Sequence, residues 1–191
     1  MSNPQQSKIV LLGPEGVGKT CMLERLRTGE YNSSTEATVG ASFACRTVKM
    51  PSGKTARLNV WDTAGQERFE SMLPIYVRNT AVAVICISEP NLDAVMKYHD
   101  FVLYHSINTE VYIAITKSDL VLSRRFFDDI KEYAKTIPAK MYFTSSLTGE
   151  NISEIFTDIA EVIEKIPPQA PRSVLQMDME DPSERWVRCC W

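Results

Sequence analysis

Short runs of apolar and β-branched residues recur along the chain, and each ends at a turn residue or leads into a stretch with helical spacing. Residues 8–12 form the first run and stop at Gly13, which is typical of a strand buried on both faces of a parallel sheet. Five further strands are expected, at 43–49, 55–61, 81–87, 111–115 and 140–144. The second and third strands are separated by Pro51, Ser52 and Gly53, which predicts a hairpin.

Helical spacing occupies most of the intervals between these strands, and helices are expected at 18–28, 92–104, 125–136 and 152–166. The last is the clearest, because its isoleucine, valine and phenylalanine side chains recur three, four and seven positions apart and form one apolar face. Strands that alternate with helices predict one α/β domain. Its sheet would have six mostly parallel strands, one antiparallel edge strand and helices on both faces.

Composition and charge narrow the class of protein. The chain has 191 residues, 44% of them hydrophobic and 24% charged, which suits one globular domain. The net charge of -3 and the lack of a basic run argue against nucleic-acid binding. The longest apolar run, 81–87, is far shorter than the roughly 18 residues of a membrane span. No signal peptide is apparent, so we expect a cytosolic protein with free thiols.

Three regions are expected along the chain: a flexible N-terminus at 1–7, the domain at 8–166 and a flexible tail at 167–191, which holds four prolines and shows little periodicity. Cys21, Cys45 and Cys86 fall in expected helices or strands, so we expect all three to be buried. His99 and His105 are six positions apart in a helical stretch, and we expect packing or surface roles for them rather than a metal site.

Residues 13–20 read GPEGVGKT and fit the P-loop pattern, between a strand and the start of a helix. Its glycines let backbone amides point at phosphate oxygens, and the helix N-terminus adds positive potential. Lys19 would reach the β and γ phosphates, and the Thr20 hydroxyl would coordinate Mg²⁺. The alternative is a glycine-rich turn that binds nothing, and the surrounding strand and helix disfavour it.

Two later motifs identify the nucleotide and the reaction. Asp62 closes a strand and could hold Mg²⁺, while Gly65 would offer a backbone N–H to the γ phosphate and Gln66 could orient an attacking water. Asp119, in the stretch 116–119 after another strand, could accept hydrogen bonds from both N1–H and the exocyclic amine of guanine. Adenine cannot supply that pair of donors, so a guanine nucleotide is expected.

Together these motifs resemble the small GTPases of the Ras superfamily, and specifically the Rab family. The resemblance covers 8–166 and the extreme C-terminus, and the stretch WDTAGQERF at 61–69 is highly specific. It implies a P-loop G domain that binds GTP and GDP with Mg²⁺ and hydrolyses GTP. Thr38 would be the first-switch threonine that closes on Mg²⁺ and the γ phosphate, and Tyr31 would lie edge-on to the guanine.

The resemblance assigns nucleotide contacts to Glu15, Gly16, Val17, Gly18, Lys19, Thr20, Cys21, Tyr31, Thr38, Gly65, Thr116, Lys117, Asp119, Ser145, Ser146 and Leu147. Metal contacts fall to Thr20, Thr38 and Asp62, and catalytic roles to Gln66, Lys19 and Thr38. The switch segments would be 31–45 and 65–78. Phe43, Trp61 and Tyr76 match an exposed aromatic triad that Rab proteins use for effectors, although core packing is an alternative for Phe43 and Trp61.

Four positions depart from the family pattern. Thr116 replaces the usual Asn and Leu147 the usual Lys, so guanine affinity is expected to be lower but not lost, since Thr116 keeps a hydroxyl. Glu15 stands where the P-loop faces the γ phosphate, and we hypothesise that it alters intrinsic hydrolysis. The alternative is an outward-turned glutamate with no kinetic role. Ser42 replaces a frequent Asp, which bears on effector identity.

Turnover without a partner is expected to be slow, because no arginine is evident in position to neutralise transition-state charge. A partner's arginine or equivalent group would add a factor of about 10³ to 10⁵. The resemblance implies a switch in vesicle traffic, with effectors, an exchange factor, a GTPase-activating protein and a prenyl-chaperone as partners. The second reading is a GTP-bound scaffold with little or no hydrolysis that recruits effectors.

Cys189 and Cys190 resemble the double-cysteine ending of Rab proteins, which implies geranylgeranyl groups on both thiols. Two chains are needed for stable anchoring, since one gives only marginal binding. The tail carries three arginines against four acids, so attraction to anionic lipid would be weak. We therefore expect a monomer that cycles between the cytosol and the cytoplasmic face of endomembranes, with unmodified thiols as the alternative.

Overall fold

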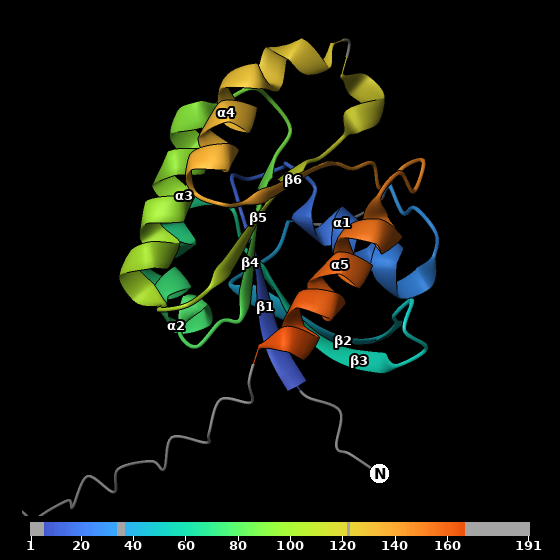
Figure 1. Cartoon of the computed structure of the whole chain (residues 1–191). Helices are drawn as coiled ribbons and strands as arrows, with labels where there is room; N and C mark the ends of the chain where they lie inside the picture. Colours follow the sequence, from blue (N-terminus) through green and yellow to red (C-terminus); the bar gives the residue numbers. More distant parts are fainter. Residues whose placement is uncertain (1–5, 34–36, 122, 167–191) are drawn as a thin grey trace, which may run out of the picture.

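A computed structural model describes residues 6–33, 37–121 and 123–166. Six strands form a single sheet in the order β2-β3-β1-β4-β5-β6 (Figure 1). β2 is antiparallel to β3, and the other neighbouring pairs are parallel. The strands are β1 (Gln6–Leu12), β2 (Ala41–Lys49), β3 (Thr55–Thr63), β4 (Val82–Ile87), β5 (Glu110–Ile115) and β6 (Lys140–Phe143). The predicted fold class is confirmed.

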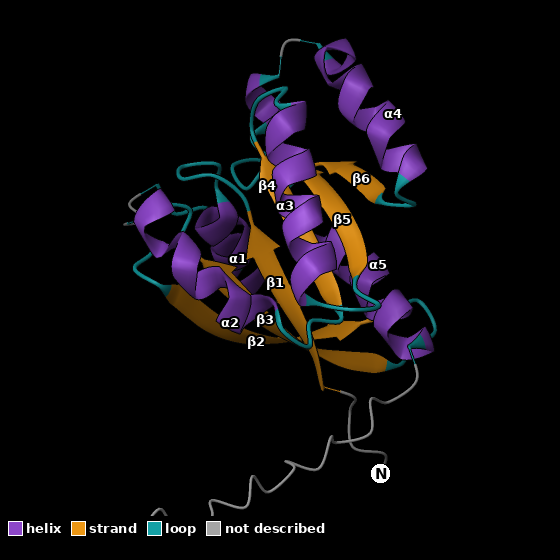
Figure 2. Cartoon of the chain, turned by 90° about the vertical axis from the view of Figure 1, so that its left-hand side faces the viewer, coloured by secondary structure: helices purple, strands orange, loops and turns teal. Residues whose placement is uncertain are grey.

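Helices cover both faces of this sheet. The α-helices are α1 (Lys19–Thr28), α2 (Leu73–Val77), α3 (Leu92–His105), α4 (Asp128–Thr136) and α5 (Ile152–Lys165). Short 3₁₀ helices are η1 (Glu67–Met72), η2 (Ser118–Leu120) and η3 (Arg124–Phe127). Figure 2 shows α2 and α3 in front of the sheet. Together with α4 they form hydrophobic cores on this face of the sheet, and α1 and α5 form the core on the other face.

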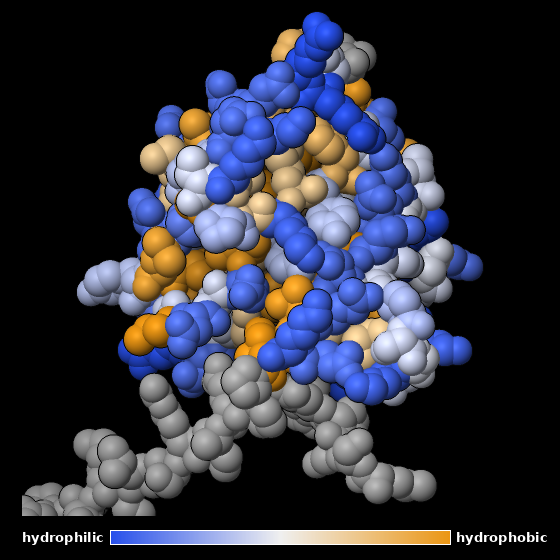
Figure 3. Space-filling view, in the orientation of Figure 1, coloured by the Kyte–Doolittle hydropathy of each residue, from blue (hydrophilic) through white to orange (hydrophobic). Residues whose placement is uncertain are grey.

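The alternation of side chains along β1 shows how the two faces are filled. Ile9 and Leu11 pack in the core beneath α1 and α5, whereas Val10 and Leu12 pack beneath α2 and α3. All four are fully buried, as expected for a strand covered on both faces. The helices are amphipathic, and hydrophilic residues cover most of the outer sides of α4 and α5 (Figure 3).

Some boundaries differ from those expected. The helix expected at 125–136 is divided into η3 and α4, and Asp128 and Asp129 lie in the first turn of α4, where the helix dipole favours acidic groups. β1 begins at Gln6, within the segment expected to be a flexible N-terminus. In the described ranges, no helix is both long and apolar enough to cross a bilayer.

The expected burial of the cysteines was wrong for two of the three. Cys86 is fully buried in β4, but Cys21 and Cys45 are half-buried. Cys21 lies on the side of α1 that faces a cavity, and Cys45 lies on the edge strand β2, where Arg57 Nε approaches its Sγ at 2.7 Å.

The ends of several strands meet at one edge of the sheet. The carboxyl ends of β1, β3, β5 and β6 lead into the loops that carry the predicted motifs, and β2, being antiparallel, begins at this edge with Ala41 opposite Thr63. In open α/β sheets the ligand binds outside the carboxyl ends of the strands. The motifs separated in sequence are therefore brought to one place.

Candidate guanine-nucleotide and magnesium site

The P-loop turn between β1 and α1 depends on close backbone approaches that only glycine allows. A Cβ at Gly13 would lie 2.1 Å from Cys86 O on β4. A Cβ at Gly65 would lie 2.5 Å from the backbone of Pro14 and Glu15. Both distances are far below contact, so these glycines set how closely the P-loop lies against β4 and against the loop after β3.

Lys19 is buried at the base of this loop, with 5% of its surface exposed. Its Nζ donates to Gly13 O and Pro14 O, each at 2.8 Å. Burial lowers the pKa of the Lys19 ammonium, while the nearby carboxylates of Asp62 and Glu15 oppose that shift. Lys19 is thus a buried cation at the N-terminus of α1. An anion bound there would interact with both the ammonium group and the helix N-terminus.

A cavity of about 230 Å³ lies over Lys19. It is lined by the P-loop and start of α1, by Ala37 and Thr38, and by Thr63, Gly65 and Gln66. Three predicted motif segments therefore surround one cavity. Threonine hydroxyls, the Lys19 ammonium and P-loop backbone amides line it, which are groups that bind phosphate, and the Glu15 carboxylate lies at its edge.

Two threonine hydroxyls converge on a buried carboxylate beside this cavity. Thr20 Oγ1 donates to Asp62 Oδ2 at 2.8 Å, and Thr38 Oγ1 lies 3.1 Å from the same oxygen and 2.9 Å from Thr20 Oγ1. Ser42 Oγ reaches that oxygen at 3.5 Å. The sequence alone relates Ser42 only to effector identity, and this contact is not evident from it. Its place opposite Asp62 in the β2–β3 register explains the contact.

The donor set fits a magnesium ion. Burial raises the pKa of Asp62, while hydrogen bonds from Thr20 and Thr38 and the charge of Lys19 act in the other direction. Asp62 Oδ1 is buried and has no hydrogen-bond partner within the described residues. A carboxylate with a spare oxygen beside two hydroxyls is a hard oxygen set of the kind Mg²⁺ prefers. Among the described residues, no group of three or more His, Cys, Asp or Glu side chains could hold a metal, and the oxygen set here combines one carboxylate with hydroxyls instead.

A second cavity of about 340 Å³ continues from the first, over the loops that follow β5 and β6. It is lined on one side by Thr116, Lys117 and Asp119, on another by Ser146 and Leu147, and by Tyr31. Ser145 is fully buried, and its Oγ donates to Asp119 Oδ1 at 2.5 Å, which holds that carboxylate in place. The structure thus brings the residues expected to recognise guanine around one hollow.

The hydroxyl of Thr116, which stands where the family pattern has an asparagine, makes two hydrogen bonds to backbone carbonyls. The residue is buried, and Thr116 Oγ1 lies 2.6 Å from Val17 O in the P-loop and 3.0 Å from Ile87 O at the end of β4. The hydroxyl therefore ties the loop after β5 to the P-loop. Leu147 is half-exposed and contributes an apolar wall to the cavity.

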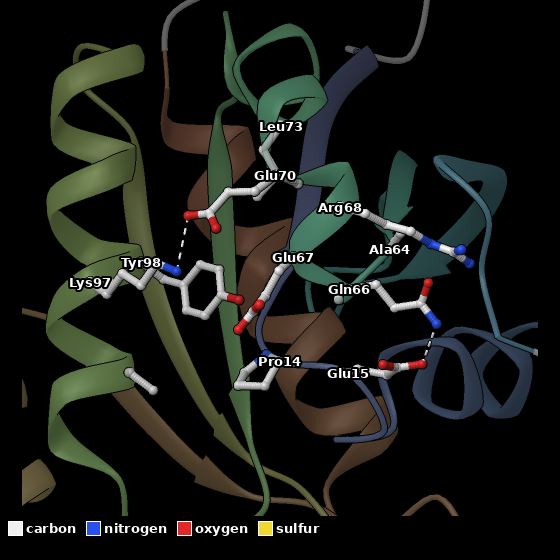
Figure 4. Close-up of a pocket in the computed structure, with 12 residues that line it drawn as sticks. Pro14, Glu15, Ala64, Gln66, Glu67, Arg68, Glu70, Leu73, Lys97 and Tyr98 are labelled. Carbon is white, nitrogen blue, oxygen red and sulfur yellow. Dashed lines mark hydrogen bonds and ion pairs between the residues drawn. The ribbon is translucent and has the colours of Figure 1, made fainter.

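Glu15 contacts a residue that sequence reasoning did not pair with it. Its Oε1 accepts a hydrogen bond from Gln66 Nε2 at 2.5 Å, and Figure 4 shows the two side chains pointing toward each other. Gln66 Oε1 is buried and lacks a hydrogen-bond partner among the described residues. The two residues are 51 positions apart in the sequence, so no local pattern could have revealed this pair.

The Glu15–Gln66 pair separates the phosphate cavity from a larger hollow of about 770 Å³ between the η1 region and α3. Both residues line both spaces. Lys97 on α3 forms an ion pair with Glu70 across the hollow at 2.9 Å. The pair therefore lies on the boundary between the smaller cavity over Lys19 and the larger hollow.

Phe43, Trp61 and Tyr76 form a continuous aromatic surface on β2, β3 and α2. The ring centroids of Phe43 and Trp61 are 5.2 Å apart, and those of Trp61 and Tyr76 are 5.6 Å apart. Phe43 is 54% exposed, so core packing does not account for it, whereas Trp61 is half-buried against the core. Lys8 lies over the Trp61 ring at 5.6 Å and donates to Arg78 O. Cys189 and Cys190 lie outside the described residues.

Comparison with known proteins adds two findings. Residues 8–165 match the model of the Ras family. The chain is 33% identical over 169 residues to the Ras-related protein Rab-21 of Geodia cydonium, an alignment that covers 85% of this chain and 73% of the relative.

Proposed function

The chain belongs to the Rab branch of the Ras family of small GTPases, and from this premise we propose that it is a slow, membrane-anchored GTP/GDP switch in vesicle traffic. The observation that carries the proposal is the convergence of Lys19, Thr20, Thr38, Asp62 and Gln66 on one phosphate-sized cavity. Each of these side chains supplies a group that phosphoryl transfer needs.

Phosphoryl transfer requires mainly positioning and charge neutralisation, and the residues of this site would provide both. Lys19 would exchange its bonds to two P-loop carbonyls for the β and γ phosphate oxygens. Gly65, held against the P-loop, would offer its backbone N–H to the γ phosphate. Mg²⁺, when bound, would neutralise phosphate charge, and Thr20, Thr38 and Asp62 would hold it. Gln66 would orient the attacking water through its buried amide oxygen.

Loss of the γ phosphate would release the switch segments. Thr38 contacts the rest of the site through hydroxyl bonds to Thr20 and Asp62, and Gln66 contacts the P-loop through Glu15. These side-chain contacts join Thr38 and Gln66 to the phosphate side of the site, so a change in phosphate charge would bear directly on whether the segments stay closed. Effectors would recognise the closed form at Phe43, Trp61 and Tyr76. An exchange factor, a GTPase-activating protein and a prenyl-chaperone would be its other partners.

Base selection would depend on Asp119 and on the Ser146 backbone amide. Asp119, held by Ser145, would accept from N1–H and from the exocyclic amine of guanine, and the Ser146 amide would donate to its carbonyl. Tyr31 would lie at the edge of the base. A site built to hydrogen-bond these groups rejects a base that lacks them.

A second function is favoured by one observation. Glu15 occupies the amide donor of Gln66, so a chain whose Gln66 stays bound would be a GTP-loaded scaffold that recruits effectors with little hydrolysis. Single-turnover measurement of GTP hydrolysis with and without a GTPase-activating domain distinguishes the two functions. Acceleration by the domain supports the switch, and a rate that stays near zero in both conditions supports the scaffold.

Membrane anchoring would use Cys189 and Cys190 as geranylgeranyl acceptors. Two lipid chains would hold a monomer on the cytoplasmic face of endomembranes without help from tail charge. Imaging a tagged full chain beside a Cys189→Ser/Cys190→Ser variant tests this proposal. Diffuse cytosolic signal for the variant and membrane signal for the wild type are expected, and identical distributions would contradict it.

A further inference from the structure

The guanine-end cavity has two walls that come from different loops. Asp119 lies in η2, after β5, and Ser146 lies in the loop after β6. A base can meet both only if the two loops keep a fixed distance from each other. The side chains that join the loops therefore influence the affinity of the site for guanine.

Glu150 is the residue that makes several of these connections. Its Oε2 accepts from Ser118 Oγ at 2.6 Å, and its Oε1 accepts from Arg124 Nη2 at 2.8 Å. Its backbone carbonyl accepts from Ser145 N at 3.0 Å. Ser118 precedes Asp119, and Ser145 precedes Ser146, so Glu150 holds the neighbour of each guanine-facing residue while lying outside the cavity itself.

The loop after β5 needs such support because its backbone is strained. Lys117 has φ 53° and ψ 40°, in the left-handed region that is unfavourable for a residue with a side chain. The next residue is fixed twice, through Ser118 N to Thr144 O at 3.0 Å and through Ser118 Oγ to Glu150. The second of these bonds is the one that a side chain of the other loop supplies.

The two contacts of the Glu150 carboxylate differ in strength. The side chain of Arg124 is 64% exposed and that of Glu150 is 38% exposed, so their ion pair is screened by water. The Ser118 hydroxyl is half-buried, and its bond to a carboxylate is charge-assisted. The connection to Ser118 therefore dominates.

We propose that Glu150 is a positioning residue of the guanine site: by fixing Ser118 it sets the place of Asp119, lengthens the residence of bound GDP and sharpens selection for the 2-amino group of guanine. This inference rests on the proposed binding of guanine nucleotide.

The test uses the full chain and measures release of radiolabelled GDP from the wild type and from Glu150→Ala. We expect about tenfold faster release from the variant, equivalent to about 1.4 kcal/mol. The second measurement is the affinity for inosine diphosphate, which lacks the 2-amino group. Because Asp119 would lose its alignment, the preference for GDP over inosine diphosphate falls several-fold in Glu150→Ala.

Three further variants test the individual contacts. Ser118→Ala should match Glu150→Ala, Arg124→Ala should stay within about twofold of the wild type, and Glu150→Gln should recover part of the loss, because its amide oxygen can still accept from Ser118. Glu164→Ala is the matched control, since it breaks an exposed ion pair with Lys54 far from the cavity and should leave release unchanged.

The outcomes separate the two levels of the argument. A wild-type chain that does not bind GDP refutes the proposed function itself. A wild type that binds GDP, with Glu150→Ala losing GDP and inosine diphosphate equally or losing neither, overturns the positioning role. The ratio of the two affinities does not depend on the folded fraction, so a destabilised variant still decides the question.

Discussion

Replacing Glu15 with serine should accelerate intrinsic GTP hydrolysis. In the structure the Glu15 carboxylate holds the amide of Gln66 at 2.5 Å, on the boundary of the phosphate cavity. A hydrogen bond to a charged group contributes about 1.5–3 kcal/mol, and Glu15 is exposed, so we take about 1 kcal/mol. Releasing Gln66 to orient water would lower the barrier by that amount, which is a rate increase of about fivefold.

The assay is single-turnover hydrolysis of preloaded GTP in the presence of Mg²⁺. Glu15→Gln separates charge from hydrogen bonding, because its amide oxygen can still accept from Gln66, and an intermediate rate is expected. Repeating Glu15→Ser in a Gln66→Ala background completes a double-mutant cycle, in which the gain should vanish. An unchanged or slower rate for Glu15→Ser refutes the reasoning. A gain that survives without Gln66 refutes the part assigned to the hydrogen bond.

Thr116→Val removes the hydroxyl that joins the loop after β5 to the P-loop. We expect urea denaturation to show a loss of about 1–2 kcal/mol in the free energy of unfolding, and nucleotide-exchange measurements to show faster GDP release. His99 is buried against Tyr133, and burial lowers its pKa from the usual 6.5, so the unfolded chain binds a proton that the folded chain does not. The free energy of unfolding should therefore fall as the pH drops below about 6.5, and His99→Gln should flatten that dependence in denaturation curves. Chelating Mg²⁺ with EDTA should speed GDP release at least about tenfold in the wild type and less in Asp62→Asn, and equal acceleration in both would contradict the metal site.

Much of the fold follows from local pattern, because the central strands are buried on both faces and show as unbroken apolar runs. The strands expected at 81–87 and 111–115 correspond to β4 and β5, and their boundaries agree to within one residue. The stretch after β3 had no periodic pattern to interpret, and it forms η1 and the short α2. Its conformation depends on packing against α3, which a local window does not contain.

The site shows the same division. The P-loop and the residues after β3, β5 and β6 carry motifs whose spacing reflects backbone geometry, so their convergence could be expected. The contacts of Glu15 with Gln66 and of Glu150 with Ser118 join segments 51 and 32 positions apart. Such pairs are set by tertiary structure and have no sequence period. Cys45 was misjudged for a related reason, since a strand pattern does not say which strand lies at the edge.

The Thr116 hydroxyl connects the loop that would read the base with the loop that would cradle the phosphates. Two binding regions joined through one buried group behave as a single body, so a free-energy change at one is felt at the other. A base that fits the site poorly would then lose its own contacts with the protein and would also weaken the binding of the triphosphate. In this chain, recognition and chemistry would be thermodynamically linked through a single oxygen atom.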